Sequence, residues 1–267
     1  MLVGDVVGKP GLQFTVRCIR GLKRRELVDI AVVNAENAAD GSGLTPPMFH
    51  SLIDAGADCV TLGDHIYRRR EIFEVLESDN RIVKPCNYPD DAPGKRWTVV
   101  STPSGASVGI FSALGRVFMK PVDCPFRAAD RVLEEMPSEA KIRLLDFHAE
   151  ATSDMQLMGR YLDGRVSAVL GTHTHVPTAD EQILPGGTAF QSDVGMTGPH
   201  DSILGRQIDK VQETTLTFRP TFFQVAKNDV KLHATVVDVN DRTGAATDIR
   251  RVVVTQDDVK ELEQLIA

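Results

Sequence analysis

Five short apolar runs of this sequence, each rich in residues that favour β-strands, end beside residues that can bind metal ions. The runs cover residues 1–5, 30–37, 59–65, 143–148 and 168–175. Their candidate ligands are Asp5, Glu36, Asn37, Asp64, His148, His173 and His175. In α/β proteins, polar groups at the ends of strands form the functional sites. The pattern therefore predicts an α/β fold whose strands bring these residues to one edge of a sheet.

Length and charge narrow the class of protein. Hydrophobic residues make up 42% of the 267 residues, and α/β chains of this length often form one domain, so we expect a single domain over residues 1–267. The formal net charge of −7 offers no basic surface for long nucleic acids, although metal charge could hold a small phosphorylated substrate. The four cysteines lack CxxC spacing, and no run resembles a signal peptide or a membrane span. We expect a cytoplasmic protein with reduced cysteines and no membrane contact.

Helical periodicity fills the segments between the runs, which favours parallel βαβ units. We predict helices over residues 13–26, 46–55, 69–77 and 125–136, two of which begin with proline, a residue favoured in the first turn. After residue 212, the β-prone segments 222–225, 230–239 and 245–254 are separated by turn sequences. They predict a closing antiparallel meander, so the sheet should be mixed rather than purely parallel.

The candidate ligands have the chemistry of a two-metal centre. Two ions about 3.5–4 Å apart need a bridging carboxylate, further oxygen or nitrogen ligands, and open positions for water and substrate. Glu36 is the natural bridge, Asn37 can add a carbonyl oxygen, and His173 and His175 should point to the same side of an extended chain. Such donors suit manganese, iron or zinc better than calcium. Water bound there can lose a proton near pH 7 and attack phosphorus, while His65 could protonate the leaving oxygen as a general acid.

Two nucleotide-binding motifs are excluded by spacing. Gly4, Gly8 and Gly11 do not match the dinucleotide fingerprint, and Gly8-Lys9 is followed by Pro10 rather than by the Ser or Thr of a phosphate-binding loop.

Longer motifs identify a family. The strings GDVVGKPG from Gly4, NAENAADGSGLT from Asn34, DFHAEATS from Asp146, DGRVSAVLGTHTHVPTAD from Asp163 and SDVGMTGPHDSILG from Ser192 resemble the YmdB-like metallophosphoesterases, a branch of the calcineurin-like superfamily. The resemblance spans nearly the whole chain. It implies a four-layer α/β/β/α sandwich with mixed sheets and hydrolysis of small phosphodiesters, with 2′,3′-cyclic nucleotides as a substrate class. It also implies two divalent or mixed-valence metal ions, iron or manganese before zinc or magnesium, and favours a homo-oligomer.

The same resemblance suggests how the ligands divide between two ions. Asp5, Asn37 and His175 would hold one ion, Glu36 would bridge, and Asp64, His148 and His173 would hold the other, while His65 matches the catalytic histidine. The family usually has Gly-Asn-His where this chain has Gly63-Asp64-His65, so we expect higher metal affinity and lower Lewis acidity. The chain also begins only four residues before Asp5, which shortens the first strand relative to the family pattern.

Several further residues have two interpretations each. His200 and Arg116 could contact substrate or lie in solvated loops, and Asp146 and Asp193 could orient ligand imidazoles or bind loop amides. His50 and His233 match no motif, so we expect both on the surface. Two alternative functions also stay open: a phosphomonoesterase on the same metals, and a regulator that keeps the metal and binds a nucleotide or a protein.

Overall fold

Two mixed β-sheets face each other in this protein, whose computed structural model describes residues 1–267. The first sheet has eight strands in the order β2-β12-β13-β1-β3-β4-β5, and β14 also pairs with β13. Its strands are β1 (Leu2–Val3), β2 (Asp5–Val6), β3 (Val32–Asn34), β4 (Cys59–Thr61), β5 (Ile82–Val83), β12 (Met196–Pro199), β13 (Val230–Val239) and β14 (Ala246–Val254). Strands β1, β3, β4 and β5 run parallel, and β13 is antiparallel to β1.

The second sheet has six strands in the order β10-β11-β9-β8-β7-β6. They are β6 (Trp97–Ser101), β7 (Ser107–Leu114), β8 (Ile142–His148), β9 (Ala168–Thr172), β10 (Gln182–Ile183) and β11 (Ala189–Gln191). Strands β7, β8, β9 and β11 are parallel, whereas β6 and β10 at the two edges are antiparallel to their neighbours. The predicted mixed pairing is therefore present in both sheets.

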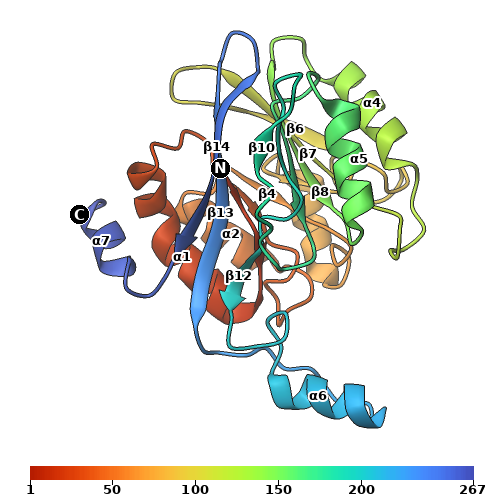
Figure 1. The fold of residues 1–267 in the computed structure, drawn as a ribbon, viewed down its shortest axis with the longest axis vertical. Helices are drawn as coiled ribbons and strands as arrows, with labels where there is room; N and C mark the ends of the chain where they lie inside the picture. Colours follow the sequence, from red (N-terminus) through yellow and green to blue (C-terminus); the bar gives the residue numbers. More distant parts are fainter.

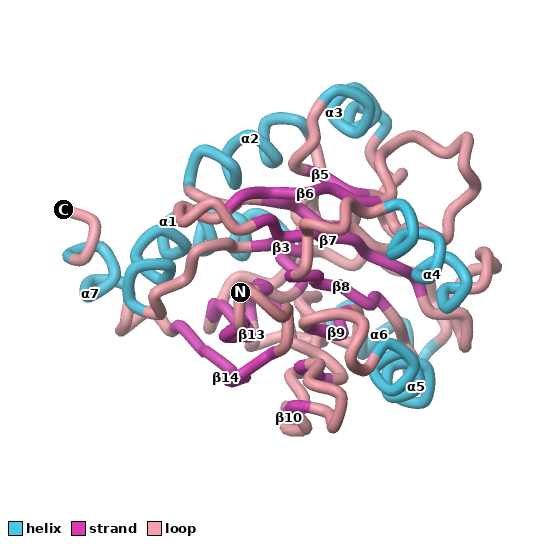
Figure 2. Tube along the Cα trace, turned by 90° about the horizontal axis from the view of Figure 1, so that it is seen from above, coloured by secondary structure: helices cyan, strands magenta, loops and turns pink.

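Helices cover the outer face of each sheet. Figure 2 shows α1 (Gly8–Arg25) and α7 (Val259–Gln264) on one side, α4 (Pro125–Glu135) and α5 (Thr152–Leu162) on the other, and the strands between them. Three apolar cores separate these layers: one under α1, one under α4 and α5, and one between the sheets. The expected four-layer α/β/β/α sandwich is thus confirmed.

The predicted helices are present with shifted ends. The helix expected over 13–26 begins five residues earlier, because Pro10 is tolerated in the first turn of α1, where its missing N–H has no partner to lose. Helix α2 (Pro46–Ala55) matches its prediction, and α4 ends one residue before its predicted end. The segment 69–77 divides into a 3-10 turn, η1 (Arg70–Ile72), and the short helix α3 (Phe73–Ser78).

The predicted closing meander is only partly present. Strands β13 and β14 form the expected hairpin, but residues 222–225 form no strand and contribute only a single bridge from Val225 to Arg206. They belong instead to an arm that carries α6 (Ile208–Thr217), which projects away from the body (Figure 1). Helix α6 buries none of its residues, so it has no amphipathic packing face that the sequence pattern could reveal.

Candidate metal centre

The strand ends of both sheets converge on one cluster of polar side chains. It contains all seven predicted ligands and His65, linked by contacts of 4.0 Å or less. Asp5 lies in β2 and His148 is the last residue of β8, whereas the other residues follow β3, β4 and β9 in loops. The prediction that these residues meet at the edge of one sheet was therefore wrong in one respect. The cluster lies where the strands of two facing sheets end together.

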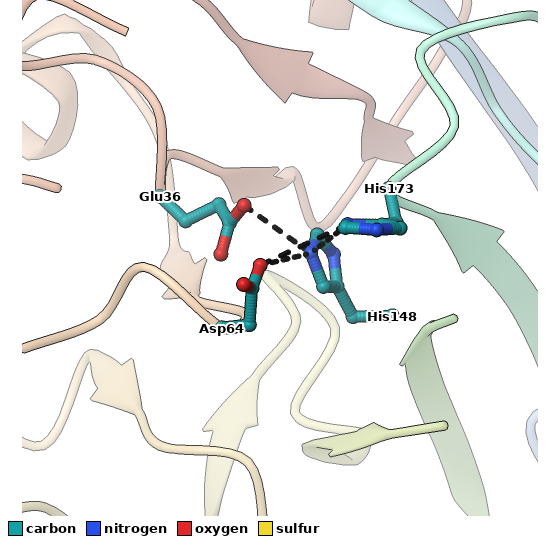
Figure 3. A group of neighbouring side chains, drawn as sticks. All are labelled: Glu36, Asp64, His148 and His173. Carbon is teal, nitrogen blue, oxygen red and sulfur yellow. Dashed lines mark hydrogen bonds and ion pairs between the residues drawn. The ribbon is translucent and has the colours of Figure 1, made fainter. Parts of the chain in front are cut away.

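Four of these residues surround one point (Figure 3). Glu36, Asp64, His148 and His173 each offer an oxygen or nitrogen atom, and these four atoms lie within 4.8 Å of one another. His148 Nε2 is 3.2 Å from Glu36 Oε1 and 3.5 Å from Asp64 Oδ1. His173 Nδ1 is 2.9 Å from His148 Nε2. The cluster can therefore present two imidazoles and two carboxylates to a single cation.

The remaining three predicted ligands form a second group beside the first. Asp5 Oδ1 is 3.8 Å from His175 Nε2, and the Asn37 amide nitrogen is 3.3 Å from the same imidazole nitrogen. Asn37 Nδ2 also donates to Glu36 Oε1 over 3.0 Å. Glu36 thus contacts members of both groups.

Two buried oxygen atoms show that the cluster suits cations. Asp5 Oδ1 and Asp64 Oδ1 are buried and have no hydrogen-bond partner, although an unpaired buried carboxylate oxygen is costly. The close approach also depends on Gly63, since a Cβ there would lie 2.3 Å from His148 and 2.4 Å from Glu36. Nitrogen and oxygen donors in this mixture fit a transition-metal ion. The residues present therefore fit a metal centre.

The charges of the cluster also favour the binding of cations. Burial disfavours the ionised form of Glu36, but His148 and His65 outweigh burial and hold the pKa of Glu36 well below its ordinary value. Burial likewise disfavours protonated His148, yet Glu36, Asp64 and Asp5 raise the pKa of His148 well above its ordinary value. Three carboxylates around one imidazole thus create a strongly negative potential, which metal ions would neutralise.

A buried hydrogen-bond network fixes the orientation of His148. Thr172 donates its hydroxyl proton to Asp146 Oδ1 over 2.6 Å, so its oxygen must accept from His148 Nδ1, 2.9 Å away. The proton of neutral His148 therefore lies on Nδ1, and the Nε2 lone pair faces the cluster. Asn34 and Thr61 donate to the other Asp146 oxygen from the first sheet. Of its two interpretations, Asp146 has the one that supports a ligand imidazole, although it acts through Thr172.

The Thr-His-Thr-His segment differs from the expected extended chain. Strand β9 ends at Thr172, and His173 and His175 both have left-handed φ values, 109° and 66°. The Thr174 amide and hydroxyl both donate to Asp193 Oδ2, so Asp193 binds loop groups rather than an imidazole. Non-glycine residues rarely adopt such φ values. Residues that do adopt them are found mostly at functional sites.

Two further residues, Glu150 and Lys120, lie beside the cluster and were not predicted from the sequence. Glu150 Oε2 is 3.2 Å from His173 Nε2, so it binds the ring nitrogen that faces away from the other ligands. Lys120 Nζ donates to the Asp64 carbonyl over 2.8 Å. The DFHAEATS string contains Glu150, which offered a signal, whereas Lys120 lies 56 residues from Asp64 in a loop without a motif.

The remaining candidates lie outside the cluster. His200 stacks on His233, with ring centroids 4.9 Å apart. Burial is the main reason why the pKa of His233 is lowered to about 4. The expectation that His233 lies on the surface was therefore wrong: it is partly buried in β13 because His200 covers it. His50 is exposed, as expected, and Arg116 is exposed as well, which is compatible with both of its interpretations.

Similarity to known proteins agrees with this geometry. The model of the YmdB-like protein family matches residues 1–252. This chain belongs to the YmdB-like family. It is 42% identical to the 2',3'-cyclic-nucleotide 2'-phosphodiesterase of Bacillus subtilis (strain 168), over 96% of this chain and 97% of that protein.

Two solved structures also share the fold. The crystal structure of a hypothetical protein from Thermus thermophilus has a TM-score of 0.88 at 41% identity and covers 95% of this chain and 98% of its own. A crystal structure described as a novel phosphatase, from Mycoplasma pneumoniae, has a TM-score of 0.89 at 28% identity, with coverages of 98% and 95%. The predicted family is confirmed, and relatives named phosphodiesterase and phosphatase confirm the predicted hydrolase class.

None of the helices combines the length and the apolar character needed to cross a membrane. The four cysteines are all unpaired, and three of them are buried.

Proposed function

We propose that this protein is a phosphodiesterase that holds two metal ions and hydrolyses small phosphodiesters, with 2′,3′-cyclic nucleotides as its substrate class. The observation that carries the proposal is the pair of buried, unpartnered oxygens, Asp5 Oδ1 and Asp64 Oδ1, which lie in two adjacent groups of ligands around Glu36. The similarity to the Bacillus subtilis enzyme supports the substrate class.

We assign the ligands to two ions in the way that the family resemblance implies. Glu36, Asp64, His148 and His173 would hold one ion, and Asp5, Asn37, His175 and Glu36 would hold the other. The donor set favours iron or manganese, with zinc or magnesium as alternatives. When bound, the ions would supply positive charge to the phosphoryl oxygens and lower the pKa of coordinated water to near 7.

Asn37 links ligand binding to the proton on His65. Its amide oxygen now accepts from His65 Nδ1 over 2.8 Å, while its amide nitrogen faces Glu36 and His175. A ligand role requires the oxygen on the opposite side, so the amide must turn over, and its nitrogen then faces His65. His65 Nδ1 would then lose Asn37 as its acceptor, and Glu36 Oε1, 3.3 Å away, would accept the Nδ1 proton of the His65 imidazolium.

The position of His65 suits an acid that serves the leaving group. Its backbone N–H donates to Glu36 Oε2 over 3.0 Å, and its side chain remains 27% exposed at the mouth of the cluster. A proton on Nε2 can therefore reach a bound substrate while the backbone stays fixed by the bridging carboxylate. In this role the His65 imidazolium gives its Nε2 proton to the ribose oxygen as that oxygen leaves phosphorus, and His65 ends as neutral imidazole with its remaining proton on Nδ1.

Parallel assays with three substrates would test the function. Protein reconstituted with Mn²⁺ or Fe²⁺ under anaerobic conditions would be analysed for metal content and assayed with 2′,3′-cyclic AMP, bis(p-nitrophenyl) phosphate and p-nitrophenyl phosphate. We expect close to two ions per chain and faster hydrolysis of both diesters than of the monoester. Preference for the monoester would indicate a phosphatase, and metal binding without turnover would indicate a regulator.

We also propose a cytoplasmic homo-oligomer. Unpaired cysteines support a reducing compartment. Leu216, Phe218 and Phe222 on the arm around α6 are between 71% and 91% exposed, and apolar surface of this kind marks protein contacts. Light scattering of the purified protein would give its oligomeric state directly.

A further inference from the structure

Asp64 differs from the other two carboxylates of the centre because it contacts a lysine. Lys120 Nζ lies 3.5 Å from Asp64 Oδ2 and donates to the Asp64 backbone carbonyl over 2.8 Å. Asp5 and Glu36 form ion pairs only with histidines. The Asp64 side chain is 15% exposed, whereas those of Asp5 and Glu36 are fully buried. A single ammonium group therefore faces the one carboxylate ligand that solvent can reach.

The loop between β7 and α4 holds Lys120 at this position from both sides. Before Lys120, the backbone amides of Arg116 and Val117 donate to Asp154 Oδ2 over 3.0 and 3.1 Å. After it, the backbone amide of Asp123 donates to the Asn87 carbonyl over 3.1 Å. The neighbouring Met119 packs against the core under α4 and α5. Lys120 is thus held beside Asp64 by an anchored loop rather than by a free surface chain.

The contact bears on the charge of the metal centre. A carboxylate ligand carries a full negative charge, which strengthens metal binding. The same charge leaves less positive charge on the ion to polarise a phosphoryl oxygen. An ammonium group beside the same carboxylate offsets part of that charge. We propose that Lys120 is a positioning residue that acts through Asp64, weakening metal binding at this position and increasing turnover. This inference rests on the proposed function.

A double-mutant cycle would test the proposal. The variants are Lys120→Met, Asp64→Asn and the double variant. Lys120→Arg keeps the charge, and Lys260→Met removes an exposed lysine of α7, far from the centre. Two quantities would be measured: the affinity of the metal-free protein for Mn²⁺, by competition with a chelator, and kcat and KM for bis(p-nitrophenyl) phosphate.

Exposed ion pairs give small effects, so we expect Lys120→Met to raise Mn²⁺ affinity about two- to five-fold and to lower kcat by a similar factor, with KM unchanged. Lys120→Arg and Lys260→Met should match the wild type. In the Asp64→Asn background, the effects of Lys120→Met on affinity and on kcat should fall by at least half, because no carboxylate charge remains to be offset.

Two results would overturn the proposal. A rise in KM that persists in the Asp64→Asn background would show that Lys120 contacts the substrate directly. Unchanged Mn²⁺ affinity in Lys120→Met would show that the contact has no influence on the metal. The affinity measurement needs no substrate, so failure of the proposed phosphodiesterase activity would leave it interpretable.

Discussion

The metal centre has a floor and a rim that are built differently. The floor comprises Asp5, Glu36 and His148, whose side chains are fully buried. The rim comprises Asp64, His65, His173 and His175, whose side chains are 11–27% exposed and lie in loops. Strands hold Asp5 and His148, and a buried hydrogen-bond network orients His148, whereas Glu36 and the rim residues lie in loops that follow strands. We therefore expect metal retention to depend most on the floor, and the rim to combine further ligands with the residues that tune the chemistry.

The largest effect should come from the floor. Glu36 contacts both groups of ligands, so Glu36→Ala should remove both ions and abolish turnover, whereas His175→Ala on the rim should weaken mainly one ion. Elemental analysis after reconstitution would measure this difference. Circular dichroism would check that both variants fold. Equal metal loss in the two variants would mean that floor and rim do not differ in this way.

His65 on the rim should affect chemistry without affecting metal content. General acid help contributes ~10²–10⁴ in rate and matters most for a poor leaving group. His65→Ala should therefore slow hydrolysis of 2′,3′-cyclic AMP by ~10²–10⁴, and hydrolysis of bis(p-nitrophenyl) phosphate far less, because nitrophenolate leaves without protonation.

Both rates would be measured at matched metal content. Equal losses on the two substrates, or loss of metal, would make His65 a ligand or a positioning group. His200 would not replace it as the acid, since its ring stacks on His233 and makes no contact with the cluster.

The sequence revealed the residues of this centre more fully than their supports. Apolar runs ending in polar residues identified the members of the cluster because strands end at a common site, and motif resemblance supplied their proposed division between two ions. Local pattern could not show that two sheets meet, nor that Thr172 and Asp146 orient His148, because those contacts join distant segments. Lys120 was missed for the same reason. The sequence also did not predict the left-handed φ values of His173 and His175, because non-glycine residues rarely adopt them.

The support beneath the floor gives the next prediction. Thr172→Val keeps the shape of the side chain but removes the hydroxyl that accepts from His148 Nδ1. Loss of such an outer partner typically costs ~10–100-fold in metal affinity, so we expect Mn²⁺ affinity to fall within that range. Thr172→Ser should restore it.

Thr98→Val offers a matched control, because Thr98 is a buried threonine in β6 of the same sheet. Thermal unfolding of the metal-free proteins would separate lost affinity from lost stability. Wild-type affinity in Thr172→Val would show that the floor needs no support from this network.

The smallest effect should come from Asp64, the carboxylate of the rim. Asp64→Asn replaces a charged ligand by a neutral amide of nearly the same shape, so the ion keeps more positive charge for the phosphoryl oxygen. We expect turnover of bis(p-nitrophenyl) phosphate to rise several-fold, with a smaller change in the number of ions retained. Metal content and kcat would be measured on the same preparation. A fall in turnover at full metal content would mean that the rim has adapted to the aspartate, and Lys120, which contacts its carbonyl and carboxylate, would then be the first residue to change alongside it.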